Sequence, residues 1–218
     1  MVELMRAMNA SIKPKTPEAT APSILKGKVV IGKNGKVSLA AANDDVWSKY
    51  PEIMAYSGSS KVQKMIDVAL ENSNWVLSQK NRSKVSRRVN YYSTGNCLRH
   101  VKQALVVAGI TDSYINASRV NRPEGLMLER LREKKFVNLL NDPKYSSIIT
   151  NAASAPKGAL LVYAGGGNGG HIEIKTGFGN TGTYVSDFQQ SQTIMQNALG
   201  GRSSKNYRLI GVMVKPGV

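Results

Sequence analysis

The 218-residue chain contains very little cysteine and histidine: one cysteine, Cys97, and two histidines, His100 and His171. A single cysteine excludes a disulfide within the chain, and so few Cys and His side chains exclude a structural zinc site of the usual kind. Apolar runs are short, and none approaches the ~20 residues that a membrane-spanning helix needs. We therefore expect a globular chain with no metal and no membrane span.

Acidic residues are also few, because 14 Asp and Glu stand against 30 Lys and Arg, for a formal net charge of +16. Such an excess attracts a protein to polyanions such as nucleic acid, anionic lipid or an acidic cell wall. The densest basic segments, residues 80–88 and 130–135, lack the interleaved aromatic residues of nucleic-acid-binding motifs. A solvated basic surface is therefore favoured over a nucleic-acid site.

The first 80 residues are expected to form a leader and an extension. Residues 1–23 include a segment rich in Pro, Ser, Thr and Lys, typical of a disordered leader, and they lack the apolar segment of a secretory signal. Residues 24–80 then carry two β-branched stretches around Asn34 and Gly35, which predict a small hairpin. Apolar residues recur every three or four positions between 46 and 77 and predict an amphipathic helix, capped by Ser59 or Ser60.

Residues 81–218 are expected to form the main domain. An apolar stripe predicts a helix over 97–108, with Gly109 just beyond its end, and a second helix is expected over 125–135. Short β-rich runs separated by turns follow at 158–164, 170–176, 183–188 and 207–214. Helices followed by strands predict an α+β domain with an antiparallel sheet.

Cys97 and His171 are the candidate nucleophile and base. A thiol is a strong nucleophile only as thiolate, and the N-terminus of a helix, where Cys97 is expected, stabilises negative charge. A buried structural thiol is the alternative for a lone cysteine. Strand alternation over 171–175 puts His171 and Glu173 on one face, after a glycine-rich loop that leaves the approach to the histidine open.

Two further assignments remain open at this stage. Asp187 is the carboxylate that alternation places best to orient the imidazole of His171 from the neighbouring strand, and Glu173 is the alternative third group. His100 lies one helical turn from Cys97 and competes with His171 for the role of base.

Four segments of the chain carry a family pattern: residues 95–110 (GNCLRHVKQALVVAGI), 156–162 (PKGALLV), 170–174 (GHIEI) and 184–190 (YVSDFQQ). In this order they resemble the papain-like peptidoglycan hydrolases of the NlpC/P60 and CHAP type, and most closely the cell-wall amidase effectors and phage lysins. The pattern covers roughly residues 91–214 and departs from the family at Ala159, where an Asp is usual.

The resemblance implies a papain-like α+β fold and a cysteine peptidase or amidase without a metal or other cofactor. Cys97 would attack a peptide or amide carbonyl, His171 would act as base and then as acid, and Asp187 would orient His171. Further side chains would contribute substrate or oxyanion contacts: Tyr91, Tyr92, Asn96 and Gln189.

The resemblance also implies a substrate and a compartment. Bacterial peptidoglycan would be the substrate, and an inhibitor protein or a delivery apparatus would be a further partner. Synthesis in a cytoplasm would be followed by action in the periplasm or cell wall, after release by a phage or by a secretion route without a signal peptide. The alternative is a basic nucleic-acid-binding or virion structural module in which Cys97 and His171 have no catalytic role.

Overall fold

The computed structural model describes residues 29–31, 37–39, 44–81, 96–117, 126–165, 169–179, 181–194 and 207–218. The chain divides into two compact units, Met1–Ala40 and Ala41–Val218. In the first unit, strands β1 (Val29–Ile31) and β2 (Val37–Leu39) pair antiparallel, as the predicted hairpin requires. The expected leader, residues 1–23, and the Asn34–Gly35 turn lie outside the described residues.

The second unit begins with helices α1 (Asp44–Trp47), α2 (Pro51–Gly58) and α3 (Ser60–Asn81). The hydroxyl oxygen of Ser59 accepts a hydrogen bond from the N–H of Lys61, so Ser59 caps α3 as predicted. Apolar side chains of these helices, among them Trp47 and Tyr56, are buried in the same core as those of the sheet. The structure therefore has no boundary at residue 80, because the stripe predicted for an extension packs into the main domain.

Helices α4 (Cys97–Val107) and α5 (Leu126–Glu133) follow, close to the predicted ranges, and Gly109 with φ +69° lies just beyond α4. A short 3-10 helix, Ala152–Ser154, precedes the central strands. Every strand pair in the six-stranded sheet is antiparallel, and the order is β3-β8-β4-β5-β6-β7. The strands are β3 (Val137–Asn138), β4 (Leu160–Ala164), β5 (His171–Lys175), β6 (Tyr184–Val185), β7 (Gln189–Gln190) and β8 (Arg208–Val214).

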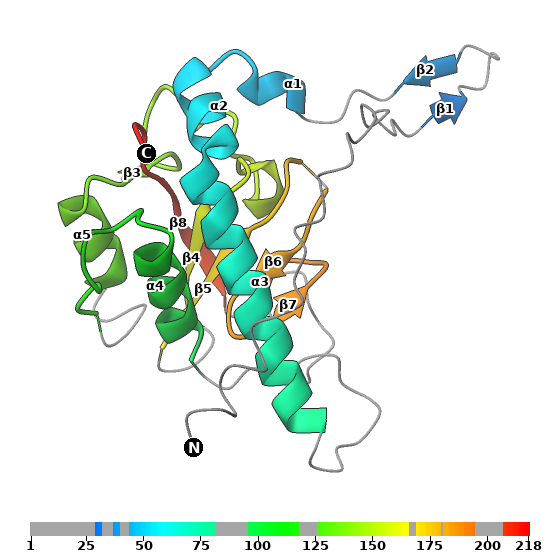
Figure 1. Ribbon diagram of the computed structural model, residues 1–218. Coiled ribbons are helices and arrows are strands. Elements are labelled where there is room, and N and C mark those ends of the chain that lie inside the picture. The colour runs from blue at the N-terminus through cyan, green and yellow to red at the C-terminus, as the bar shows by residue number, and fades with distance from the viewer. Residues whose placement is uncertain are drawn as a thin grey trace, which may run out of the picture. The chain divides into compact units, whose positions relative to one another are not determined.

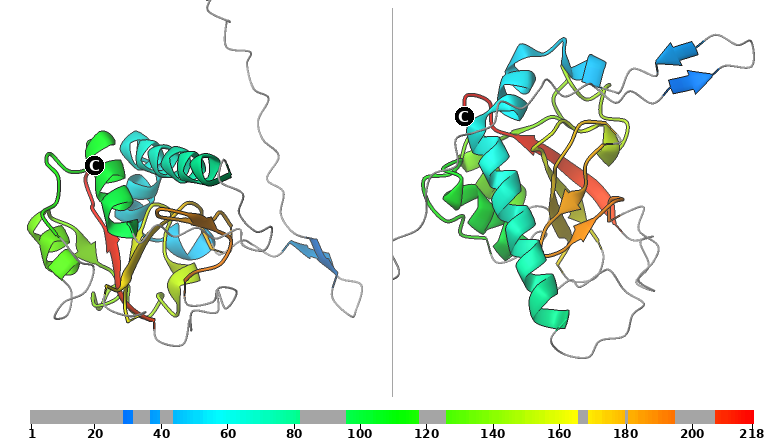
Figure 2. Two further views of the ribbon diagram at one scale, coloured as in Figure 1. Left: turned by 90° about the horizontal axis from the view of Figure 1, so that it is seen from below. Right: turned by 45° about the vertical axis from the view of Figure 1, so that its right-hand side comes forward.

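The helices and the sheet together make an α+β fold, which confirms the predicted class. Helices α3 and α4 lie side by side and both contact β5 (Figures 1 and 2). Because α4 begins beside β5, residues from two distant parts of the sequence meet there. In the part of the chain that the structure describes, no helix has the length and apolar composition that a membrane crossing needs.

Gly158, two residues before β4, lies close to side chains of both α2 and α3. The hydroxyl of Tyr56 donates to the carbonyl oxygen of Gly158 at 2.8 Å. Gly158 has φ +83°, and a Cβ atom there would lie 2.3 Å from Cγ1 of Val62. Both the backbone conformation and the space therefore require glycine at this position.

We expect Gly158→Ala to lower the free energy of unfolding by about 2–4 kcal/mol, since strain at positive φ adds to overpacking. Gly109→Ala is the matched control, because Gly109 has φ +69° but a Cβ atom added there would have no other atom within 4 Å. That variant should lose only about 1 kcal/mol. Urea denaturation measures both values, and equal losses would contradict the close approach of α3 to β4.

Candidate active site

Cys97 is the first residue of α4, and its side chain is 9% exposed. Backbone N–H groups in the first turn of a helix have no intrahelical partner and stabilise negative charge nearby. Asn96, at the N-cap position, makes no side-chain cap bond, and its backbone N–H donates to Oδ2 of Asp187 at 3.4 Å. The sulfur thus lies at the positive end of a helix whose apolar stripe is fixed against the sheet.

His171 is the first residue of β5, and its imidazole interacts with the thiol of Cys97. Burial, the largest single influence, lowers the pKa of His171, but the contacts with Cys97 and Glu173 outweigh it and raise this pKa to about 10. The imidazolium is therefore the favoured form at neutral pH. An imidazolium beside a sulfur stabilises the thiolate, which is the reactive form of cysteine.

Glu173 is the carboxylate that faces this imidazolium. Its Oε2 lies 3.4 Å from Nε2 of His171, an ion-pair distance at which no aligned hydrogen bond forms. The carboxylate is completely buried, and it accepts hydrogen bonds of 2.7 Å from the hydroxyl of Tyr163 and from Nε2 of Gln190. Since hydrogen bonds to a buried charge are strong, these two donors fix the orientation of Glu173.

The charge of Glu173 also affects the neighbouring phenols. Burial first, and the negative charge of Glu173 second, raise the pKa of Tyr163 well above its usual range. The same two causes, in the same order, raise the pKa of Tyr184 to about 12. Both phenols therefore keep their protons at neutral pH, so Tyr163 remains a hydrogen-bond donor to Glu173.

Three aromatic rings surround the imidazole of His171. The ring centroids of Phe188, Tyr163 and Tyr207 lie 5.7, 6.1 and 6.2 Å from that of His171. His171 is consequently only 4% exposed, whereas the sequence predicts an open approach to it. The prediction fails because alternation places a side chain on a face of the sheet but does not show what packs over that face.

Asp187 does not lie where the sequence predicts. Strand β6 ends at Val185, so Asp187 follows the strand instead of continuing its alternation. Its buried carboxylate accepts from the backbone N–H of Asn96 at 3.4 Å and from the hydroxyl of Ser186 at 3.2 Å. The structure thus brings Asp187 to the start of α4, and the ion pair of His171 is formed with Glu173.

His100 lies one turn after Cys97 on α4 and is half-buried. Burial lowers the pKa of His100, and the negative charge of Asp187 opposes that effect only partly. Its Nδ1 atom is buried without a hydrogen-bond partner in the described part of the chain. Since the contact with Cys97 raises the pKa of His171, and burial lowers that of His100, His171 is the favoured base.

Among the remaining predicted contacts, Gln189 is not part of this cluster. Gln189 is exposed, and its Nε2 donates to Oγ1 of Thr183 at 3.1 Å. Tyr91 and Tyr92 lie outside the described residues. The sequence interpretation missed Tyr163 and Gln190, the two donors to Glu173. The signal for Tyr163 is its place directly opposite His171 in the β4–β5 register, which requires the strand pairing to be known.

The cluster can carry out nucleophilic acyl transfer with its own side chains. A cysteine sulfur, a proton donor and a fixed carboxylate lie in sequence, and the first turn of α4 offers N–H groups to an oxyanion. Within the described residues, no group of three or more Cys, His, Asp or Glu is placed to hold a metal ion. No protein-family model, curated protein or solved structure matches the chain.

Proposed function

We propose that the protein is a cysteine peptidase or amidase with a papain-like fold that cleaves the peptide part of bacterial peptidoglycan. One observation carries the enzymatic part of this proposal. Cys97, at the start of a helix, interacts with a histidine whose pKa is raised to about 10 and whose ring faces the buried carboxylate of Glu173. A merely structural cysteine does not require a charged partner of this kind.

In the proposed reaction, the thiolate of Cys97 attacks the carbonyl carbon of the scissile bond. The resulting oxyanion accepts hydrogen bonds from N–H groups at the start of α4. The imidazolium of His171 donates its proton to the leaving amine, and the C–N bond breaks to leave a thioester on the sulfur. Water then gives a proton to the neutral imidazole and attacks the thioester, which releases the acid and restores the thiolate.

The choice of substrate depends on the four family segments and on charge. The segments resemble cell-wall amidase effectors and phage lysins, and a net charge of +16 favours contact with an anionic wall. We accordingly propose action in the periplasm or the cell wall of a bacterium, with an inhibitor protein or a delivery apparatus as a further partner.

Purified sacculi test the proposal. The protein should lower the turbidity of a suspension of sacculi, and mass spectrometry of the released muropeptides should show new amino and carboxyl ends at one peptide or amide bond. Protein alkylated beforehand with iodoacetamide is the control and should release nothing. If sacculi stay intact in the presence of folded protein whose Cys97 still reacts with iodoacetamide, the wall is not the substrate. A DNA complex that is sensitive to salt and unaffected by alkylation would favour a nucleic-acid-binding module.

A further inference from the structure

A second group of charges gathers at the opposite end of α4 from Cys97. It consists of Lys61, Lys134, Lys135 and Lys215, and we refer to it as the lysine cluster. Nζ of Lys134 lies 2.6 Å from Oδ1 of Asp112, and Nζ of Lys215 donates to the carbonyl oxygen of Ile110 at 2.7 Å. Both lysines therefore contact the segment that follows α4.

The other two lysines are brought to the same place by α3 and by the β3–β8 pair. Val137 is paired with Val214, so the residues just before β3 lie beside those just after β8, and the charge of Lys135 acts on Lys215. The charges of Lys134, Lys135 and Lys61 all act on Lys215, where they lower its pKa in addition to the larger effect of burial. Asp112 is the carboxylate that opposes them.

Two of the four lysines in the cluster lie where they stabilise the fold, and the other two do not. Cations are favourable near the carbonyl ends of helices, and Lys134 and Lys215 lie at the ends of α5 and α4. Lys61 instead lies in the first turn of α3, which contains no acidic residue and where the helix dipole disfavours a cation. Lys135 has φ +66°, a conformation that favours glycine. Two lysines thus occupy positions that local energetics oppose.

We propose that the lysine cluster binds the phosphodiester backbone of an anionic cell-wall polymer and so holds the enzyme on its substrate. The inference rests on the proposed function for the source of the polymer. Four lysines come from three distant parts of the chain, and Asp112, the carboxylate that acts on Lys215, is 82% exposed, so they make a surface that attracts repeated phosphates.

The neighbouring apolar groups favour such a polymer over other partners. A protein partner usually inserts an apolar anchor, and single-stranded nucleic acid usually stacks on an exposed ring. Phe136 and Ile110, which lie next to the lysine cluster, are both buried, and the ammonium group of Lys215 covers the ring of Phe136 at 5.9 Å. The exposed ring in this region, Tyr114, already has the ammonium group of Lys102 over it at 4.4 Å. Lysine ammonium groups bind phosphates as point charges.

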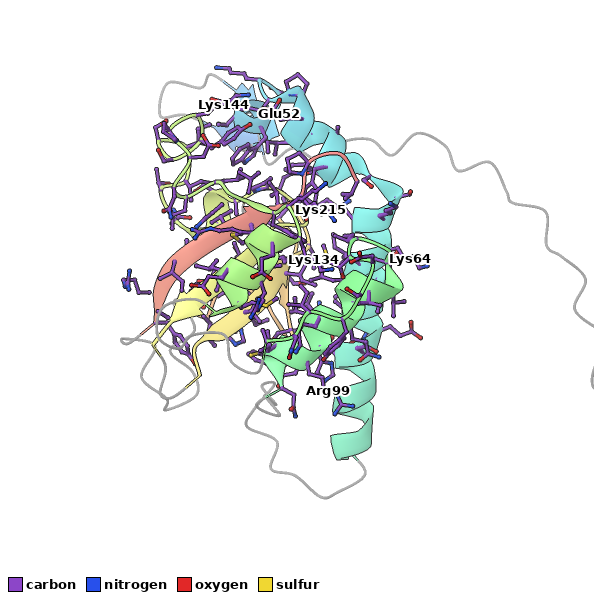
Figure 3. All side chains as sticks on the ribbon, turned by 90° about the vertical axis from the view of Figure 1, so that its left-hand side faces the viewer. Glu52, Lys64, Arg99, Lys134, Lys144 and Lys215 are labelled. Carbon is purple, nitrogen blue, oxygen red and sulfur yellow. The ribbon has the colours of Figure 1, made fainter. Side chains whose placement is uncertain are left out.

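The position of the lysine cluster permits binding and catalysis together. Figure 3 shows Lys134 and Lys215 on one face of the second unit, with Arg99 farther along the same face. Arg99 lies two residues after Cys97, and the 11 residues of α4 span about 16 Å. A polymer held by the lysine cluster therefore leaves the thiol free.

Binding is tested with the Cys97→Ala protein, which cannot digest the wall. In a cosedimentation assay, this protein should bind cell walls that carry a polyol-phosphate polymer with at least about 10-fold higher affinity than the same walls stripped with hydrofluoric acid. Added salt should weaken the binding. In the same background, Lys61→Gln with Lys135→Gly should lose at least about 10-fold in affinity for unstripped walls. The melting temperature should stay equal or rise by about 2–4 °C, because both substitutions relieve an unfavourable position.

The matched control is Lys49→Gln with Lys157→Gln, which removes the same charge outside the lysine cluster. It should change the affinity less than about 2-fold. Equal binding to stripped and unstripped walls, or an equal loss in the control, would overturn the proposal, as would a preference for duplex DNA over the wall polymer. With Cys97 restored, the lysine variant should digest stripped sacculi at the wild-type rate. If neither the wild-type protein nor the lysine variant digests stripped sacculi while binding to unstripped walls is retained, the proposed enzymatic activity is wrong and the proposed binding surface stands.

Discussion

His171→Ala is expected to lower kcat/KM on sacculi or muropeptides by about 10³-fold or more, and Cys97→Ala should abolish turnover. The imidazolium of His171 stabilises the thiolate before attack and supplies the proton for the leaving amine, so its loss affects both steps. Both variants should keep the wild-type fold by circular dichroism. His171→Ala does leave Glu173 as a buried carboxylate without its cationic partner, and some loss of stability is expected with it.

Alkylation separates this role from a structural one, because it measures the reactivity of Cys97 without a substrate. At pH 6.5, iodoacetamide should label the native wild-type protein, and His171→Ala should slow labelling at least about 10-fold. His100→Ala is the matched control, since His100 lies on the same helix and close to Cys97 but its pKa is lowered by burial. It should label at nearly the wild-type rate. A thiol that reacts only after unfolding would mean that Cys97 is structural.

Local patterns were sufficient to predict the helices and the main strands. The stripe over 97–108 predicts α4 to within one residue, because the apolar period and the glycine at 109 are both local features of the sequence. Strands β4, β5 and β8 begin and end within two residues of the predicted runs, and β1 and β2 pair as the predicted hairpin requires. Cys97 and His171 could be paired as candidates since each lies at the start of its own element.

Features that depend on contacts between distant segments could not be predicted from local sequence patterns. Whether α3 is an extension or part of the core depends on Val62 meeting Gly158, almost a hundred residues away. The end of β6 at Val185 is set by its pairing with β7, and that end moves Asp187 out of the alternation that the sequence suggests. Glu173 is two residues from His171 on one strand, about 6.6 Å apart along it, and only the donors from β4 and β7 turn its carboxylate toward the imidazole.

This difference leads to a ranking of the two carboxylates. Glu173→Gln should lower kcat/KM at neutral pH by about 100-fold or more, because the imidazolium loses its counter-charge. Asp187→Asn should change it by less than about 10-fold, since the amide oxygen can still accept from the N–H of Asn96. The sequence interpretation, with Asp187 as the orienting residue, predicts the opposite order.

The pH profile distinguishes loss of the counter-charge from general damage to the fold. The pKa of His171, about 10, should set the descending limb of kcat/KM, where the proton donor for the leaving amine is lost. A negative charge beside an imidazolium raises its pKa, so removing that charge in Glu173→Gln should move the limb to lower pH by about 1–3 pH units. Tyr163→Phe, which removes one donor to Glu173 and retains the charge, should move the limb less.

Asp187→Asn provides the control for this profile, because the charge of Asp187 acts on His100, whereas the contacts that raise the pKa of His171 are those with Cys97 and Glu173. Its descending limb should stay at the wild-type pH. Stopped assays on a soluble muropeptide between pH 6 and about pH 10.5, with circular dichroism at each pH, would measure all four proteins. A limb that moves in Asp187→Asn and stays in place in Glu173→Gln would return the orienting role to Asp187 and contradict the contacts described for β5.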